Sequence, residues 1–450
     1  MSEGIVTTQD IGISSCLITG SSGQQMDFKN MVIEFNYYED IFANGINGEL
    51  LISDSMGYIN ILQLQGSEVL SLKIDKPGLN LPIVGNYRIY TISNRTQPNA
   101  TNQNYIIKFC SEELFLNDQY RISKSYTKVL VSDIVTDIAF NELKIPQASL
   151  YIDSTTGLRD IVVPNFKPIQ AINWLSTFAL AGGSQNIGAP FLFYEDRDGW
   201  KFKSILTLYK QPVYKTYQYN VKGIKSDSNP MVTDLNAEIV NVLQYEHIKS
   251  FDSISAAKRG IFSNKLHTVD PLRLKFDETD FNYFKYLSNS PASLNDYNMP
   301  DTAKNRKGDT MSNASAVVKF TTTTTGQNQN PYIKSKNITI NETLIEQTLP
   351  LRTAQISLFC INRMKLLIPG DVYMTIGKVI EFNLPEVSYN NQNRQKKSDE
   401  FYSGKYLVTA VRHLFNQAGI YVTCIEICKE SSPTQFGAFN NSDPLWSSLR

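Results

Sequence analysis

Three histidines, His247, His267 and His413, carry the ring nitrogens with which this chain of 450 residues could bind a metal or transfer a proton. None of them has a second histidine or a cysteine at the spacing of metal ligands, and the HExxH motif of zinc proteases is absent. We therefore interpret each as an ordinary surface or hydrogen-bonded residue. The sequence predicts neither a metal site nor a cofactor site.

A group of carboxylates, Glu195, Asp196 and Asp198, lies at the expected tip of a β-hairpin. Paired carboxylates can hydrolyse glycosides, and clustered carboxylates can bind calcium. On an exposed β-turn, acidic residues more often form the turn itself, because their side chains accept hydrogen bonds from the nearby backbone. We interpret the group as turn-forming, with hydrolysis and calcium binding as the alternatives.

A segment that superficially resembles a phosphate-binding loop runs from Gly370 to Lys378. Its glycines are separated by six residues where that loop needs four, and Val379 stands where a Ser or Thr must bind magnesium. We therefore interpret the segment as two strand turns. A GxSxG nucleophile elbow is absent, and residues 20–23 are interpreted as a flexible loop. We expect that the protein is not an enzyme.

The charges of the chain balance at 43 Lys and Arg against 43 Asp and Glu, so no overall basic field favours nucleic acid or an anionic membrane. The basic run 394–397 is interpreted as a solvated loop, with contact to phosphates or an acidic partner as the alternative. The amino terminus lacks a signal-peptide pattern, and no apolar run reaches the roughly 18 residues that span a bilayer. We expect a soluble protein made in a cytoplasm, with no membrane insertion.

The chain has five cysteines, an odd number, and no CxxC pair. We interpret them as small buried hydrophobic residues, with metal ligands as the alternative. They are Cys16, Cys110, Cys360, Cys424 and Cys428.

The elements that must position these residues begin with a β-meander in the first hundred residues. Alternating apolar residues and turn signals predict strands there, with a polar hairpin tip over residues 93–103. The predicted strands are 31–37, 49–54, 67–74, 87–92 and 105–110.

The next hundred residues change character and predict helices. Ser132 is a plausible N-cap for a helix over residues 133–143, and a second helix is expected to begin at Pro168. A hairpin follows, with strands at 191–194 and 200–206. Residues 111–210 therefore read as a compact α+β unit.

The remaining chain returns to strand patterns at residues 238–248. Residues 285–345 could form either a mobile loop or an extended strand arm, because they combine polar residues with a threonine run that favours sheet. Residues 361–428 then read as four or five short strands closed by tight turns, which is the plan of a small barrel.

Several segments, taken in order, resemble the baseplate hub of contractile-tailed bacteriophages, a family that is also similar to the upper part of type VI secretion spikes. They are Gly48–Asp54, Gly66–Leu72, Phe109–Glu113, Arg121–Tyr126, Val163–Leu175, the hairpin 191–206, Ile368–Asp371, Gly377–Ile380, Ser403–His413 and Cys424–Ser431. The resemblance implies a mainly β fold with an α+β insert, in which two small tube-forming β-barrel domains build a homotrimeric ring.

The expected domains follow from the patterns and the resemblance together. They are a first barrel over 1–110 that is completed by 211–255, an inserted α+β domain over 111–210, an irregular region over 256–355 with a mobile loop at 285–345, a second barrel over 356–430, and a carboxyl-terminal arm over 431–450.

The resemblance implies a structural hub subunit that joins the hexameric tail tube to the trimeric central spike and lines the channel for the genome. The implied partners are two further copies of the chain, the central spike protein, tail tube or tube-adaptor proteins, baseplate wedge proteins and the tape-measure protein. DNA would pass through the lumen without specific binding. The implied location is the virion tail baseplate, after assembly in the cytoplasm of the host bacterium. The alternatives are a receptor-binding or adhesin-like virion protein and a glycan or peptidoglycan hydrolase on a β-scaffold.

The last twenty residues, 431–450, are polar apart from four widely spaced apolar side chains. We predict that this arm docks onto the spike or a neighbouring baseplate protein, and a frayed terminus is the alternative. The expected docking residues are Phe436, Phe439, Leu445 and Trp446.

Overall fold

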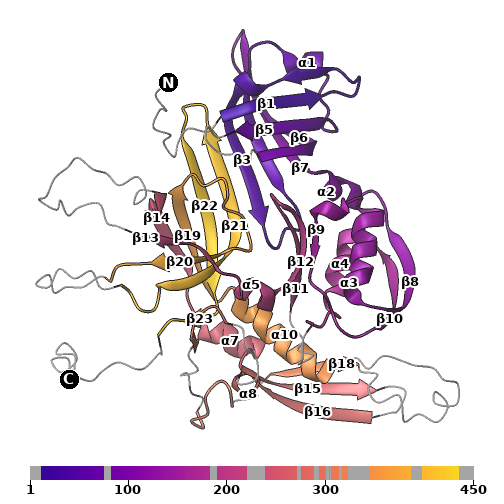
Figure 1. The fold of residues 1–450 in the computed structure, drawn as a ribbon, viewed down its shortest axis with the longest axis vertical. Coiled ribbons are helices and arrows are strands. Elements are labelled where there is room, and N and C mark those ends of the chain that lie inside the picture. Colours follow the sequence, from indigo (N-terminus) through magenta and orange to yellow (C-terminus); the bar gives the residue numbers. More distant parts are fainter. Residues whose placement is uncertain are drawn as a thin grey trace, which may run out of the picture.

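The fold is mainly β, as the sequence predicted, and Figure 1 shows its long strands with one helical unit at the side. The computed structural model describes residues 12–75, 83–182, 190–219, 239–270, 275–287, 293–299, 304, 306–313, 317–322, 345–386 and 398–434.

One sheet of 13 strands runs through the described residues, and the amino-terminal strands form one part of it. Alternation explains these strands, since β4 buries every second residue, including Leu50 and Ile52, and leaves the others partly exposed. Their buried faces form a first hydrophobic core. The elements are β1 Gly12–Thr19, β2 Gln25–Asp27, η1 Lys29–Met31, β3 Val32–Asp40, β4 Asn47–Asp54, α1 Tyr58–Ile61, β5 Val69–Asp75, β6 Ile83–Asn99, β7 Asn102–Ser111 and α2 Glu112–Asn117.

The hairpin of β6 and β7 is longer than the sequence predicted. We expected a polar tip over residues 93–103, but β6 continues to Asn99 and β7 begins at Asn102. The extension pairs polar residues across the two strands, and Arg95 donates a hydrogen bond of 2.8 Å to Gln103. Such residues can form a ribbon without an apolar face, so polarity alone misplaced the turn.

A second part of the same sheet comes from the carboxyl-terminal half of the chain. It contains β13 Val213–Gln218, β14 Gln244–Lys249, β19 Asn362–Pro369, β20 Val379–Asn383, β21 Gly404–Asn416 and β22 Tyr421–Lys429. We expected residues 211–255 to complete the amino-terminal strands, but β13 pairs with β20 and β14 pairs with β19. The reason is the apolar face of this segment, because Tyr217 and Val242 lie in a second core built from the closing strands.

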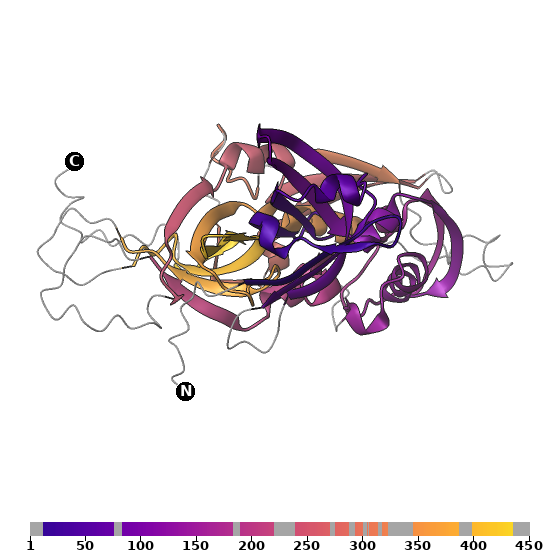
Figure 2. The ribbon, with the colours of Figure 1, turned by 90° about the horizontal axis from the view of Figure 1, so that it is seen from above.

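Strand β21 joins the two parts into one sheet. Its first residues, from Gly404 to Leu407, pair with β20, and its last residues, from Ala410 to Asn416, pair with β3. Figure 1 shows β21 beside β3, and Figure 2 shows the strands curving around a centre instead of lying flat. The strands that bury the first core and those that bury the second are therefore joined by one continuous network of backbone hydrogen bonds.

A helical unit with its own third core lies beside the first part of the sheet (Figure 1). Its second helix begins at Pro168, as predicted. Ser132 is not the N-cap of the first helix, which begins at Val131; its buried backbone N–H instead donates to the hydroxyl of Thr155. The elements are β8 Ile122–Val129, α3 Val131–Asp137, the π-helical turn η2 Ile138–Glu142, η3 Gln147–Ser149, β9 Leu150–Ile152, β10 Arg159–Phe166, α4 Pro168–Leu175, β11 Phe191–Asp196, β12 Gly199–Ser204 and α5 Ile205–Tyr209.

A fourth cluster of buried residues lies where we expected the irregular region 256–355. The described residues there form a three-stranded sheet in the order β16-β15-β18, with helix α10 in contact with it. Thr321 and Thr322 lie in β18, so this part of the threonine run is a strand. The elements are α7 Ser253–Arg259, β15 Ser263–Asp270, β16 Lys275–Asn282, α8 Tyr283–Leu287, β17 Tyr297–Asn298, β18 Val318–Thr322, α10 Ile345–Phe359 and β23 Ser431–Ser432.

Candidate functional site

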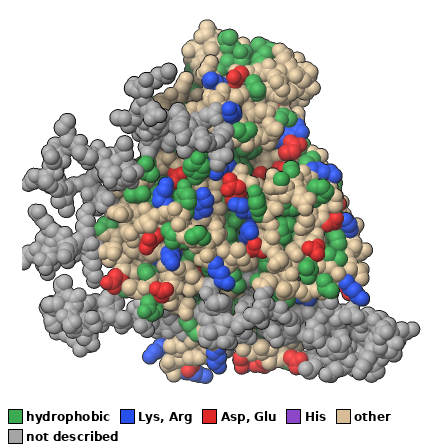
Figure 3. Space-filling view, viewed as in Figure 1, with side chains coloured by type: hydrophobic (Ala, Val, Ile, Leu, Met, Phe, Trp, Pro, Cys, Tyr) green, Lys and Arg blue, Asp and Glu red, His purple; other side chains and the backbone are tan. Residues whose placement is uncertain are grey.

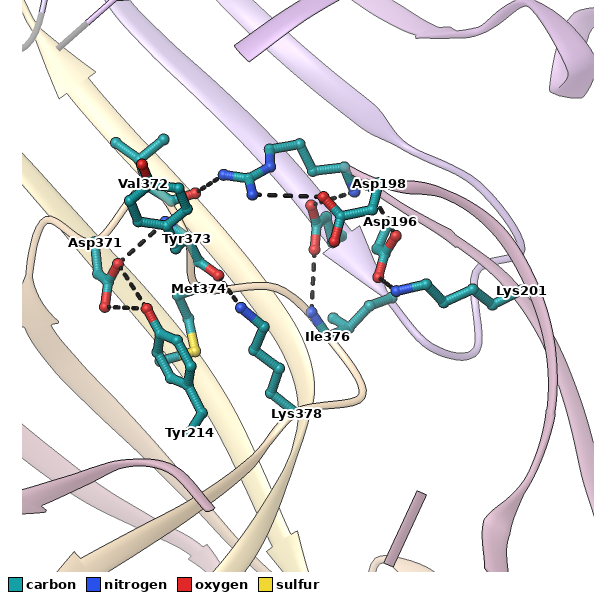
Figure 4. A network of polar contacts seen from close by, with 12 residues as sticks. Asp196, Asp198, Lys201, Tyr214, Asp371, Val372, Tyr373, Met374, Ile376 and Lys378 are labelled. Atoms are coloured by element: carbon teal, nitrogen blue, oxygen red, sulfur yellow. Dashed lines mark hydrogen bonds and ion pairs between the residues drawn. The ribbon is translucent and has the colours of Figure 1, made fainter. Parts of the chain in front are cut away.

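The predicted carboxylate group lies at a junction between the two parts of the sheet and the helical unit (Figure 4). The tip of the β11–β12 hairpin reaches the end of β3 and the loop from Gly370 to Lys378. We call this place the hairpin joint and define it by Glu39, residues 195–201 and residues 370–378. Its groups come from three segments that are far apart in the sequence.

Glu39, at the end of β3, binds both of the other segments. One of its carboxylate oxygens accepts from the backbone N–H of Arg197 at 3.0 Å, and the other accepts from that of Ile376 at 3.1 Å. The side chain is 1% exposed. Burial, followed by the nearby charge of Asp196, raises the pKa of Glu39 to about 8, against the lowering effect of the two backbone hydrogen bonds.

The predicted turn-forming role is right for Asp196. Its Oδ1 accepts from the backbone N–H of Asp198 at 3.0 Å, and its Oδ2 forms an ion pair with Lys201. Gly199 completes the turn at a φ of +134°, where an added Cβ would lie 2.4 Å from the carbonyl oxygen of Ser149. Asp196 is 1% exposed, so a polysaccharide cannot contact it in this arrangement.

Glu195 has a different role from the one we expected. It accepts a hydrogen bond of 3.0 Å from the backbone N–H of Ile46 and another from the hydroxyl of Ser111. Burial, followed by the charge of Glu113, raises the pKa of Glu195 to about 8. This carboxylate therefore fastens the hairpin to the ends of β4 and β7.

Arg197 reaches across the joint to the closing segment. Its guanidinium donates to the carbonyl oxygen of Val372 and lies 5.3 Å from the ring centre of Tyr373. The backbone of the same residue donates to Glu39. One residue of the hairpin thus contacts both parts of the sheet.

Asp371 organises the other side of the joint (Figure 4). It accepts from Lys215 at 2.7 Å and from the hydroxyl of Tyr214 at 3.1 Å, while its own backbone N–H donates to Thr423 at 3.1 Å. Burial alone would raise the pKa of Asp371, but the charge and hydrogen bond of Lys215 lower it below its ordinary value. The predicted strand turn is therefore held by an ionised carboxylate.

The glycines of the same loop serve close packing. A Cβ on Gly370 would lie 1.9 Å from the ring of Tyr421. Gly377 has a φ of +78° and lies against the hydroxyl of Tyr194. Lys378 donates to a backbone carbonyl and lies 4.1 Å from the ring centre of Tyr214, so its charge is held within the protein.

The three histidines are placed as ordinary hydrogen-bonded or packed residues. His413 is buried, with Nδ1 at 2.9 Å from the hydroxyl of Tyr421 and Nε2 at 3.1 Å from the carbonyl oxygen of Met374. Burial lowers its pKa to about 4. His247 and His267 lie elsewhere, each against aromatic rings. The five cysteines are free thiols.

The hairpin joint connects three segments of the chain through hydrogen bonds and ion pairs within the protein. Its carboxylates accept hydrogen bonds from protein donors, and three or more metal-ligating side chains do not gather anywhere in the described residues. Sequence reasoning found Glu195, Asp196 and Asp198 but missed Glu39 and Asp371. The position of Asp371 directly after Pro369 and Gly370 indicated a turn and could have drawn attention to it. Nothing in the sequence around Glu39 indicated its role.

Two predicted sites lie outside the described residues. They are the docking residues Phe436, Phe439, Leu445 and Trp446, and the basic run 394–397.

Comparison with known proteins gives a match in sequence and matches in fold. The chain is 21% identical over 413 residues to the probable baseplate hub protein gp334 of Vibrio phage KVP40. The matched residues cover 90% of this chain and 91% of that protein. No protein-family model matches. The match confirms the resemblance to baseplate hub proteins.

The solved structures that share the fold include two tail proteins. The tail protein from Neisseria meningitidis MC58 is 8% identical with a TM-score of 0.51, over 93% of this chain and 97% of that chain. The 43 kDa tail protein of prophage MuSo2 from Shewanella oneidensis is also 8% identical, with a TM-score of 0.50 over 93% and 98%. Among the described helices, none is long and apolar enough to cross a membrane.

Proposed function

We propose that this chain is a structural subunit of the baseplate hub of a contractile phage tail, in which three copies form a ring around a channel. The match to a probable baseplate hub protein over nine-tenths of both chains carries the proposal. The fold shared with two tail proteins agrees with it. The ring would join a hexameric tail tube to a trimeric central spike, with two tube-forming barrel domains from each copy.

The large sheet supports association because it ends in open strands. Among the described strands, β14 is one end of the sheet order, and most of its residues are exposed. Leu243 and Ile248 are large apolar side chains exposed at this edge. An unpaired edge with exposed apolar residues invites pairing with another chain, and pairing with a second copy would cover it.

The charge distribution agrees with a channel protein that does not bind DNA specifically. Lys and Arg balance Asp and Glu over the whole sequence, and Figure 3 shows both signs interspersed on one face of the molecule. Strong nucleic-acid binding requires a concentration of basic side chains that neutralises phosphates. A channel wall that lets the genome slide needs no such concentration.

The proposed partners in the virion are the central spike, the tail tube or its adaptor, the baseplate wedge proteins and the tape-measure protein, after assembly in the host cytoplasm. The expected arm began at residue 431, but Ser431 and Ser432 are buried in β23, which pairs with β17. The remainder, residues 435–450, is proposed to dock onto the spike or a neighbouring baseplate protein. Deleting residues 435–450 should weaken binding to the co-expressed spike at least tenfold. Undiminished binding would contradict the role of the arm and leave the ring untouched.

The role is structural, so the purified chain should release no product from peptidoglycan. Turnover of peptidoglycan that stays with the chain through purification would instead favour a hydrolase.

The direct test of assembly is the mass of the purified chain in solution. Multi-angle light scattering should give three times the 50.9 kDa of one chain at high concentration. A monomer at all concentrations would contradict the ring.

A further inference from the structure

A groove lies between the helical unit and helix α10. Two adjoining hollows of about 300 and 310 Å³ form it, and they share Thr177, Arg352 and Ile356. We propose that this groove binds a peptide segment of another protein that carries one carboxylate between apolar residues. The proposal does not depend on the assignment as a hub.

Arg352 is the residue that favours an anionic ligand in this groove. Its side chain lines both hollows, is 8% exposed, and donates from Nη2 to the hydroxyl of Ser176 at 3.3 Å. Its Nη1 is buried without a hydrogen-bond partner in the described structure. A buried cationic donor that lacks a partner costs free energy, and a carboxylate is the group that fits a guanidinium best.

The described side chains that line the groove around Arg352 supply no negative charge, so we infer that the anion belongs to a ligand. The described lining of the two hollows includes a second arginine, Arg159, and no acidic residue. Burial lowers the pKa of Arg352 to about 10, which still leaves it charged at neutral pH. A ligand carboxylate would therefore meet the charge of Arg352, with no acidic side chain in the described lining to compete for it.

The walls on either side of Arg352 are apolar and partly open. Ile356, one turn further along α10, is 49% exposed, and Phe42 at the far end is 53% exposed. Phe42 packs against Phe359 of α10, with ring centres 5.7 Å apart. Phe178 lines the opposite hollow. Apolar surface on both sides of a buried cation is complementary to an acidic residue flanked by apolar ones, which favours a peptide over a free phosphate.

The test uses two peptides on the full chain, acetyl-Leu-Phe-Glu-Leu-Phe-amide and the same peptide with Gln in place of Glu. Isothermal titration should show the Glu peptide binding at least tenfold more tightly than the Gln peptide. In the Arg352→Met variant this ratio should fall below twofold. Equal binding of the two peptides, no binding of either, or an unchanged ratio in the variant would overturn the proposal.

A second variant and a competing anion distinguish loss of the binding site from unfolding of the chain. The Ile356→Glu variant places a carboxylate four residues from Arg352 on the same helix, so it should raise Tm and abolish binding of the Glu peptide. The matched control is Ile254→Glu, an exposed isoleucine on α7, which should leave binding unchanged. Inorganic phosphate at millimolar concentration should not displace the peptide; displacement would show a general anion site and overturn the peptide assignment.

Discussion

Single residues in the hairpin joint connect segments that share no local sequence. Asp371 pairs with Lys215 and accepts from Tyr214, while Glu39 accepts backbone hydrogen bonds from the hairpin and from the closing loop. Because these groups are largely buried, each depends on its partner more than a surface pair would. The joint is therefore where single substitutions should have the largest effect on stability.

Replacing Asp371 by Asn removes the charge that compensates Lys215 and leaves a partly buried ammonium group. We expect the free energy of unfolding to fall by about 3 kcal/mol, measured by chemical denaturation at neutral pH. The matched control is Asp198→Asn at the hairpin tip, whose side chain is 47% exposed, and it should change stability by less than about 0.5 kcal/mol. Equal effects of the two substitutions would contradict the role of Asp371.

Glu39 should make stability depend on pH. Its pKa is about 8 in the folded chain against an ordinary value of 4.5, so folding takes up a proton between these values. The stability that protonated Glu39 contributes is present at low pH and is lost as pH rises through about 8. The Glu39→Gln variant cannot titrate there, so the Tm of the wild type should fall relative to that of the variant between pH 5 and pH 9. A constant difference across this range would show that Glu39 is ionised in the folded chain.

For the helices and strands, the alternation of apolar and polar residues predicted most strands correctly. It could not predict which strands pair with each other. Pro168 marked a helix start and residues 191–206 marked a hairpin, because both signals are local. The pairing of β21 with β3 joins residues more than 350 positions apart, and β13 reached β20 through burial of Tyr217. The hairpin joint could not be predicted for the same reason, since its groups meet only after these strands have paired.

The loop after β19 depends on the absence of a side chain at Gly370. Alanine there would bring a Cβ against the buried ring of Tyr421, and we expect the free energy of unfolding to fall by about 1–3 kcal/mol. Gly12→Ala is the matched control, because an added Cβ there meets no atom within 4 Å. Denaturation curves of the two variants should differ clearly, and coincident curves would show that the ring of Tyr421 moves aside without cost.

In the molecule as a whole, β21 and the hairpin joint hold together the two parts of the large sheet. Strand β14 is an exposed end of that sheet in the described residues, and this edge is the surface proposed for association. Changing Ile248 to Lys should prevent assembly without unfolding the chain, because the side chain is exposed in the single copy. Light scattering should then give the mass of one chain. The comparison variant Ile254→Lys, on α7, should assemble normally; assembly of Ile248→Lys at the full mass would place the interface elsewhere.

In the proposed assembly, three copies of the chain close into a ring around a channel. Electron microscopy of the purified chain would show whether this ring forms. Class averages should show threefold rings with a central hole. Compact single particles without a hole, at a concentration where light scattering also gives one chain, would contradict it.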